Sequence, residues 1–129
     1  GDRVAVAHAG WRGLCAGVLE RTIEALDVPA QQLIAWLGPA ISGAVYEVGP
    51  QVRDAFLTHD ERDTAAFVAN RPGHWLADLN TLACARLKRA GVTRITASAM
   101  CTYSDAQRFY SYRRDGSTGR MATYAWLRS

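Results

Sequence analysis

Residues 4–13 read Val4-Ala5-Val6-Ala7-His8-Ala9-Gly10-Trp11-Arg12-Gly13, and this stretch predicts the fold class. β-Branched valines alternate with alanines up to position 7, a pattern typical of a strand buried on both faces. His8 follows at the carboxyl end of that strand, and the two glycines indicate a turn that allows close approach. Because α/β proteins often place a ligand site at a strand end, His8 is a candidate functional residue. The alternative is a core histidine bonded to a backbone carbonyl.

The residues after this turn predict a strand–helix–strand unit. Apolar residues recur at helical spacing from Leu14 to Leu26, and the proline at position 29 ends that helix. The apolar run at 33–37 predicts a second buried strand. A right-handed crossover would bring the loop at Gly38-Pro39 to the same sheet edge as His8.

The remaining chain continues the mixture of helices and strands. Helices are expected at 50–58 and 79–90, strands at 65–69 and 92–99, a polar surface loop at 59–63, and a hairpin pairing 109–112 with 122–126. Pro50 suits a first helical turn, Asp78 can cap the second of these helices, and Gly91 can end it. The sequence therefore predicts a mixed α/β (α+β) layered fold in which helices cover a largely buried sheet.

Loops elsewhere carry further candidate residues. Tyr46 and Glu47 lie in a stretch marked by glycine and proline and could contact a substrate, although an exposed glutamate can also be merely solvated. Cys101 follows a predicted strand and is either a nucleophile or ligand, or an inert buried thiol. His59 and His74 lack metal-ligand spacing and are assigned no chemical role.

Three arginines are expected at the tip of the C-terminal hairpin. Arg113, Arg114 and Arg120 would cluster there, and guanidinium groups bind phosphate oxygens in pairs. The alternative is that Arg113 or Arg114 pairs with Asp115 or Asp105 and fixes the turn.

Composition narrows the class of protein. The 129 residues are 49% hydrophobic and 21% charged, which is ordinary for one soluble domain. The net charge of +3 comes mainly from arginine, which favours anionic small ligands, whereas a nucleic-acid binder would show a denser basic stripe. The three cysteines show no pairing pattern, which disfavours a disulfide scaffold. The sequence lacks an apolar run of about 18 residues, which disfavours a membrane span. A cytoplasmic location is expected.

Several short segments carry a shared pattern in order. They are Ala7-His8-Ala9-Gly10-Trp11-Arg12-Gly13, Leu37-Gly38-Pro39-Ala40-Ile41, Tyr46-Glu47-Val48-Gly49, Cys101-Thr102-Tyr103, and residues 109–116 with 118–122. Together they resemble the bacterial laccase-domain or polyphenol oxidase family, also called peptidoglycan editing factor. The resemblance runs from about residue 3 to Leu127.

This resemblance implies a four-layer α/β/β/α arrangement and a zinc-dependent purine nucleoside phosphorylase with adenosine deaminase activity. Copper-dependent phenol oxidation is the alternative, although a blue-copper site needs a clustered His, Cys and Met set that the sequence lacks. The resemblance makes His8 a metal ligand and catalytic residue, joined in the family by a histidine and a cysteine upstream of the matched segment. Expected substrate-binding residues are Arg12, Tyr46, Glu47, Cys101, Arg113 and Arg114.

Residues 1–129 are accordingly expected to form a single domain that is the C-terminal part of the family's domain. Such a part would expose sheet edges and apolar surface, so a homodimer or pairing with the N-terminal part is expected. Purine nucleoside and phosphate are the expected small-molecule partners, with no nucleic acid and no membrane. A non-catalytic fragment is the remaining alternative.

Overall fold

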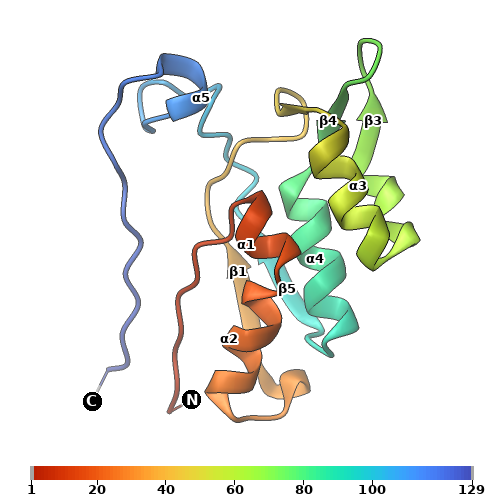
Figure 1. Cartoon of the computed structure of the whole chain (residues 1–129). Helices are drawn as coiled ribbons and strands as arrows, with labels where there is room; N and C mark the ends of the chain where they lie inside the picture. Colours follow the sequence, from red (N-terminus) through yellow and green to blue (C-terminus); the bar gives the residue numbers. More distant parts are fainter. Residues whose placement is uncertain (1, 129) are drawn as a thin grey trace.

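The computed structural model describes residues 2–128 as a mixture of short helices and strands (Figure 1). In chain order the elements are α1 Trp11–Cys15, α2 Val18–Leu26, the 3-10 helix η1 Ala30–Gln32, β1 Ile34–Leu37, β2 Glu47–Val48, α3 Pro50–His59, the 3-10 helix η2 Glu61–Ala66, β3 Phe67–Ala69, β4 Trp75–Ala77, α4 Leu79–Arg89, β5 Arg94–Ala97 and α5 Tyr112–Asp115. The predicted mixed α/β class is confirmed, while the four-layer arrangement stays a prediction.

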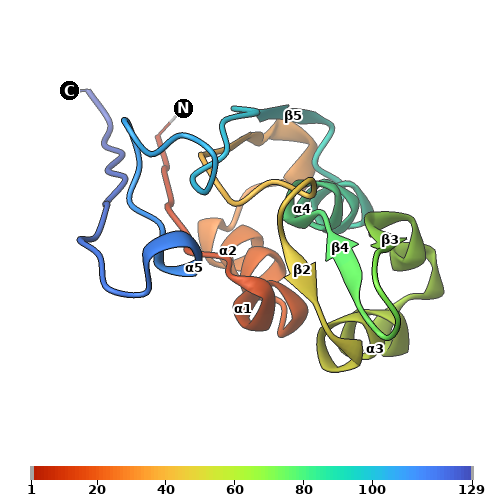
Figure 2. The same ribbon diagram turned by 90° about the horizontal axis from the view of Figure 1, so that it is seen from above.

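The strands form two separate sheets. β1 and β5 pair in parallel, with Ile34 opposite Arg94 and Leu37 opposite Ala97. The second sheet is antiparallel in the order β2-β4-β3, and Figure 2 shows its strands side by side next to α3. Both strands of the parallel sheet were predicted, β1 from its apolar run and β5 from its alternating β-branched residues. The bridge between Ala40 and Cys101 continues the parallel pairing beyond it, so the two following loops lie together.

The predicted strand at residues 4–7 is wrong. This segment has no strand assignment (Figure 1, red), and Val4 and Val6 are 45% and 55% exposed. A strand exists through its pairing with neighbours, and none of the strands described in residues 2–128 pairs with it. The expected strand–helix–strand crossover from residue 4 to β1 is therefore also wrong.

The predicted helix from Leu14 to Leu26 is two helices. α1 ends at Cys15, and α2 begins after Gly17, whose φ of 89° lies in the left-handed region that glycine adopts at little cost. The break separates a buried turn from an outer helix, because Leu14 and Cys15 are buried whereas α2 has no buried residue.

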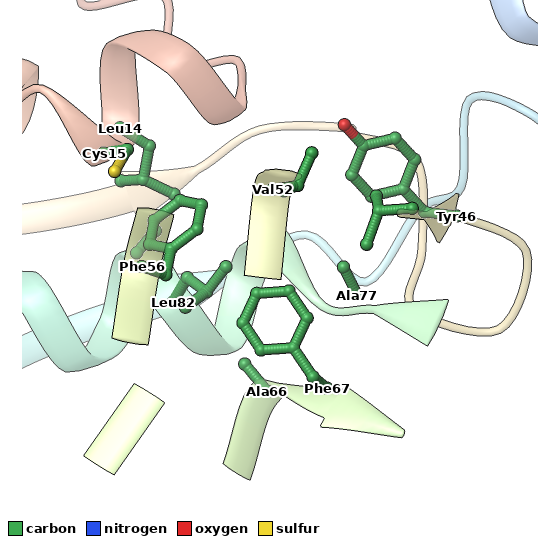
Figure 3. Close-up of a cluster of buried hydrophobic side chains, with 11 residues drawn as sticks. Leu14, Cys15, Tyr46, Val52, Phe56, Ala66, Phe67, Ala77 and Leu82 are labelled. Carbon is green, nitrogen blue, oxygen red and sulfur yellow. The ribbon is translucent and has the colours of Figure 1, made fainter. Parts of the chain in front are cut away.

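The core lies between α1, α3, α4 and the antiparallel sheet (Figure 3). Phe56 and Leu14 are fully buried, and the Phe56 ring lies tilted against that of Phe67 with centroids 6.0 Å apart. Tyr46 belongs to this core, with 7% of its surface exposed. Two of the helices that supply the core, α3 and α4, were predicted within one residue of their bounds. The expected Asp78 cap is present, since its Oδ1 accepts from the N–H of Thr81 at the start of α4.

The expected surface loop at 59–63 is only partly correct. Asp63 in η2 is 2% exposed, and its Oδ1 lies 2.6 Å from Arg89 Nη2. The Asp63 carboxylate can be buried because Arg89, at the end of α4, pairs with it. The polar sequence of the segment alone did not indicate this burial.

The predicted C-terminal hairpin is wrong. Tyr112 opens α5, where Ser111 Oγ accepts from the N–H of Arg114, and residues 117–128 have no strand or helix assignment. Gly119 lies directly on the Tyr110 ring, since a Cβ at that glycine would come within 2.8 Å of it. The capping serine and its helical turn replace the strand that the aromatic pattern indicated.

Among residues 2–128, no helix combines the length and the apolar character needed to cross a bilayer. The cysteines at positions 15, 84 and 101 are all free thiols.

Candidate active site

His8 is exposed at the end of the extended N-terminal segment, two residues before the glycine that precedes α1. Its imidazole folds over Gly10, where an added Cβ would lie 3.6 Å from Nε2. The alternative of a buried core histidine therefore does not describe this side chain. An exposed imidazole just before α1 is available to a metal ion or a substrate.

His8 is not joined by other ligands within the described part of the chain. Among residues 2–128, no group of three or more His, Cys, Asp or Glu side chains could hold a metal ion. A catalytic zinc site normally has three protein ligands and an open position. His8 fits the role of one such ligand, and residues 2–128 do not supply a complete site.

Tyr46 and Glu47 occupy different surroundings from those expected in a substrate-contacting loop. Tyr46 is buried and Glu47 belongs to β2, since the backbone of this stretch pairs with β4. The Glu47 carboxylate is held at 2.8 Å by Arg71 Nη2 and at 2.7 Å by Asn70 Nδ2. The Arg71 hydrogen bond lowers the pKa of Glu47. Glu47 is thus neither merely solvated nor free, because it links β2 to the turn between β3 and β4.

The adjacent arginines in α5 have different surroundings. Arg114 donates to three backbone carbonyls, those of Thr102, Tyr103 and Phe109, at 3.0–3.1 Å. Its guanidinium also pairs with Asp115 at 2.8 Å, which is the ion pair that the sequence analysis gave as the alternative to phosphate binding. Arg114 therefore holds the loop after β5 against α5.

Arg113 points to the antiparallel sheet instead. Its Nη1 donates to the Glu47 carbonyl at 2.9 Å, and its Cζ lies 5.0 Å from the centroid of the Tyr46 ring. Arg120 lies in the extended segment 117–128 and not at a hairpin tip with these two arginines. The expected cluster of Arg113, Arg114 and Arg120 is therefore wrong, because Arg113 and Arg114 contact different parts of the chain and Arg120 lies in the segment 117–128.

Cys101 lies where the loops after β1 and β5 meet. The N–H of Ser42 donates to its Sγ at 3.3 Å, and the thiol borders a surface hollow of about 550 Å³ with Met100, Ser104 and Arg108. Burial raises the pKa of Cys101, but hydrogen bonds from Ser104 and Ser42 lower it more, to about 6. A thiol with this pKa is largely ionised at neutral pH, unlike an inert buried cysteine.

Ser42 and Ser104 are the residues that sequence reasoning missed. Ser42 is distant in sequence from the cysteine, and it reaches the thiol through a backbone group that any residue type carries. Only the expected meeting of the loops after two parallel strands could have indicated this contact.

Comparisons with known proteins agree with the resemblance. A family model described as multi-copper polyphenol oxidoreductase laccase matches residues 1–128. The chain is 52% identical over 128 residues to a purine nucleoside phosphorylase of Pseudomonas aeruginosa and 49% identical over 127 residues to purine nucleoside phosphorylase YfiH of Escherichia coli. Both alignments cover 98% of this chain, but 53% and 52% of those relatives, so the chain spans about half their length.

Solved structures show the same fold. A Neisseria meningitidis protein, 50% identical, superposes with a TM-score of 0.86 over 88% of this chain and 47% of that chain. The YfiH protein of Bacillus licheniformis, 28% identical, gives a TM-score of 0.80 over 85% of this chain and 44% of that chain. From the match of the family model over residues 1–128, the chain belongs to the multi-copper polyphenol oxidoreductase laccase family.

Proposed function

We propose that this chain is part of a purine nucleoside phosphorylase. The proposal is based on sequence identity: over nearly its whole length, the chain is 52% and 49% identical to two relatives named for that activity. In the reaction, a phosphate oxygen bonds to C1′ of the ribosyl group while the bond from C1′ to the purine nitrogen breaks. The purine leaves with the bonding electron pair and takes up a proton, and ribose 1-phosphate is formed.

The described residues suit a reaction between a neutral nucleoside and an anion. Exposed Arg12 and Arg113 offer positive charge, and exposed His8 offers an imidazole. We further propose that His8 is one of three protein ligands of a zinc ion in the whole protein, the other two being the upstream histidine and cysteine that the resemblance implies. A bound zinc ion would supply a Lewis acid or an activated water. Adenosine deamination, in which water replaces the amino group and ammonia leaves, would be a second reaction of that site.

Copper-dependent phenol oxidation is the second candidate, and the description of the matching family favours it. Thiolate and thioether ligands select copper, and Cys101 and Met100 both border one hollow. His8 is not among the residues that line it. We therefore rank oxidation below phosphorolysis.

We propose a cytoplasmic location for the protein. We also propose that the exposed apolar residues of β1 and of the terminal segments are covered by the rest of the protein or by a second copy.

The test is an assay of inosine with and without inorganic phosphate, using protein that includes the full length of the relatives. Phosphorolysis predicts that hypoxanthine is released with an equal amount of ribose 1-phosphate, and that release falls sharply without phosphate. Phenol oxidation with no release of hypoxanthine would overturn the proposal in favour of the second candidate.

A further inference from the structure

Two side chains from separate parts of the chain meet at the edge of the core, and a third lies on the first turn of α1. Tyr46 precedes β2, Arg113 comes from α5, and Arg12 lies in the first turn of α1. The Arg113 guanidinium lies over the Tyr46 ring, with 5.0 Å between Cζ and the ring centroid. The Arg12 guanidinium lies similarly over the Trp11 ring at 4.6 Å, and Trp11 packs against the same core as Tyr46.

The Tyr46 ring and its hydroxyl face different neighbours. Its ring packs in the core, and Figure 3 shows its hydroxyl pointing away from Phe67 and Ala77. Burial raises the pKa of Tyr46, and the charges of Arg113 and then Arg12 oppose that rise. Arg113 therefore contacts the Tyr46 ring directly, and the charge of Arg12 acts on the phenol from the first turn of α1.

These two arginines keep their charge available. Within residues 2–128, neither Arg12 nor Arg113 forms an ion pair, and both side chains are exposed. Arg113 uses Nη1 for the Glu47 carbonyl, and a guanidinium has five N–H donors, so most of its donors remain. The carboxylate of Glu47, the residue whose carbonyl Arg113 bonds, is already held by Arg71 and Asn70.

The adjacent Arg114 differs in each of these respects. Its donors are taken by three carbonyls and by Asp115, and it is only partly exposed. Bidentate guanidinium groups and a phenol hydroxyl are the donor types that bind a tetrahedral oxyanion. The matching set is thus Arg113 with Arg12 and Tyr46, and not Arg113 with Arg114.

We propose that Arg12, Tyr46 and Arg113 bind a phosphoryl oxyanion, which is the phosphate consumed or the sugar phosphate formed in the reaction. This inference deepens the proposed function and rests on it for the identity of the anion. Arg12 and Arg113 would donate to the phosphoryl oxygens while the Tyr46 hydroxyl donates a third hydrogen bond. The Glu47 carbonyl would keep Arg113 oriented.

Titration of inorganic phosphate into protein that includes the full length of the relatives, followed by amide NMR, tests the site. We expect shifts concentrated at Arg12, Tyr46, Glu47 and Arg113. Arg12→Gln and Arg113→Gln should each weaken binding about 10-fold to 100-fold, since each loses charge-assisted hydrogen bonds. Arg120→Gln, which removes the same charge from an exposed position, is the matched control and should bind as the unmodified chain does.

Arg113→Lys separates loss of the site from loss of the fold. It keeps the charge but not the planar fork, so we expect intermediate affinity with amide shifts unchanged away from the substituted residue. A parallel titration with ribose 1-phosphate distinguishes the two sources of the phosphoryl group, because tighter binding of the sugar phosphate indicates a product site. Phosphate shifts located elsewhere, or equal affinity in the Arg12→Gln, Arg113→Gln and Arg120→Gln variants, would overturn the proposal.

The same variants keep this site distinct from the proposed function. Phosphate binding at these residues without release of hypoxanthine from inosine would refute phosphorolysis and leave the anion site standing. Release of hypoxanthine with phosphate affinity unchanged in both Gln variants would support phosphorolysis and refute the anion site.

Discussion

The guanidinium of Arg86 in α4 lies 3.3 Å from the carboxylate of Glu20 in α2 and 3.4 Å from the Cys15 carbonyl at the end of α1. Arg86 is 8% exposed, and its Nε and Nη2 find no hydrogen-bond partner among the described residues. Its Cζ lies 5.6 Å from the centroid of the Phe56 ring. One buried charge therefore connects three helices around the core.

Removing this charge should destabilise the fold. Arg86→Ala leaves the Glu20 carboxylate and the Cys15 carbonyl without their donor, and the free energy of unfolding should fall by about 3 kcal/mol. Urea unfolding followed by far-UV circular dichroism measures this change. Arg21→Ala, at an exposed position in α2, is the control and should cost less than about 0.5 kcal/mol. Equal losses in the two variants would show that the buried contacts of Arg86 contribute nothing.

Cys101 should be the most reactive of the three thiols at neutral pH. Its pKa of about 6 makes it mostly thiolate at pH 7, whereas burial raises the pKa of Cys15. Iodoacetamide labelling read by peptide mass spectrometry should therefore modify Cys101 first, with a half-maximal rate near pH 6.

Ser104→Ala tests the cause of this reactivity. Loss of the serine hydrogen bond should raise the pKa of Cys101 and shift the labelling midpoint to higher pH. Ser98→Ala, in the segment just before the cysteine, is the control and should leave the midpoint in place. A midpoint near the ordinary thiol value in the unmodified chain would contradict the account of this loop.

Glu47 should contribute stability that disappears in acid. Because the Arg71 hydrogen bond lowers its pKa in the folded chain, the contribution is fully present above the unfolded pKa of about 4.3 and is lost as pH falls through the folded value. Glu47→Gln should lower the melting temperature at pH 7 and have less effect near pH 3. The exposed Glu24→Gln should show no such dependence, and an identical effect of Glu47→Gln at both pH values would refute this role.

The parts of the fold that sequence predicted are those with local signals. α4 was recognised from its spacing, the Asp78 cap and the glycine at 91, β1 from a short apolar run, and β5 from its alternating β-branched residues. The failures depend on distant partners. Residues 4–7 carry a strand pattern without a neighbouring strand in residues 2–128, and 109–112 carry one that a serine cap converts to a helical turn.

The candidate site shows the same division. His8 and Cys101 could be singled out because they follow apolar runs and precede loops. The separate roles of Arg113 and Arg114 could not, since adjacent residues of one helical turn point to different neighbours, Glu47 for one and the Thr102 carbonyl for the other. Periodicity does not tell which carbonyl a guanidinium will reach.

The most direct test of the account is inosine phosphorolysis by the His8→Ala variant, measured in full-length protein together with its zinc content and melting temperature. If His8 is a ligand, turnover should fall by about a thousandfold, the bound zinc should be lost, and the apo protein should melt within a few degrees of the unmodified protein, because His8 is exposed and contributes little packing. His59→Ala, at another exposed histidine, should keep both zinc and turnover. Retained zinc with retained turnover in His8→Ala would contradict the central claim.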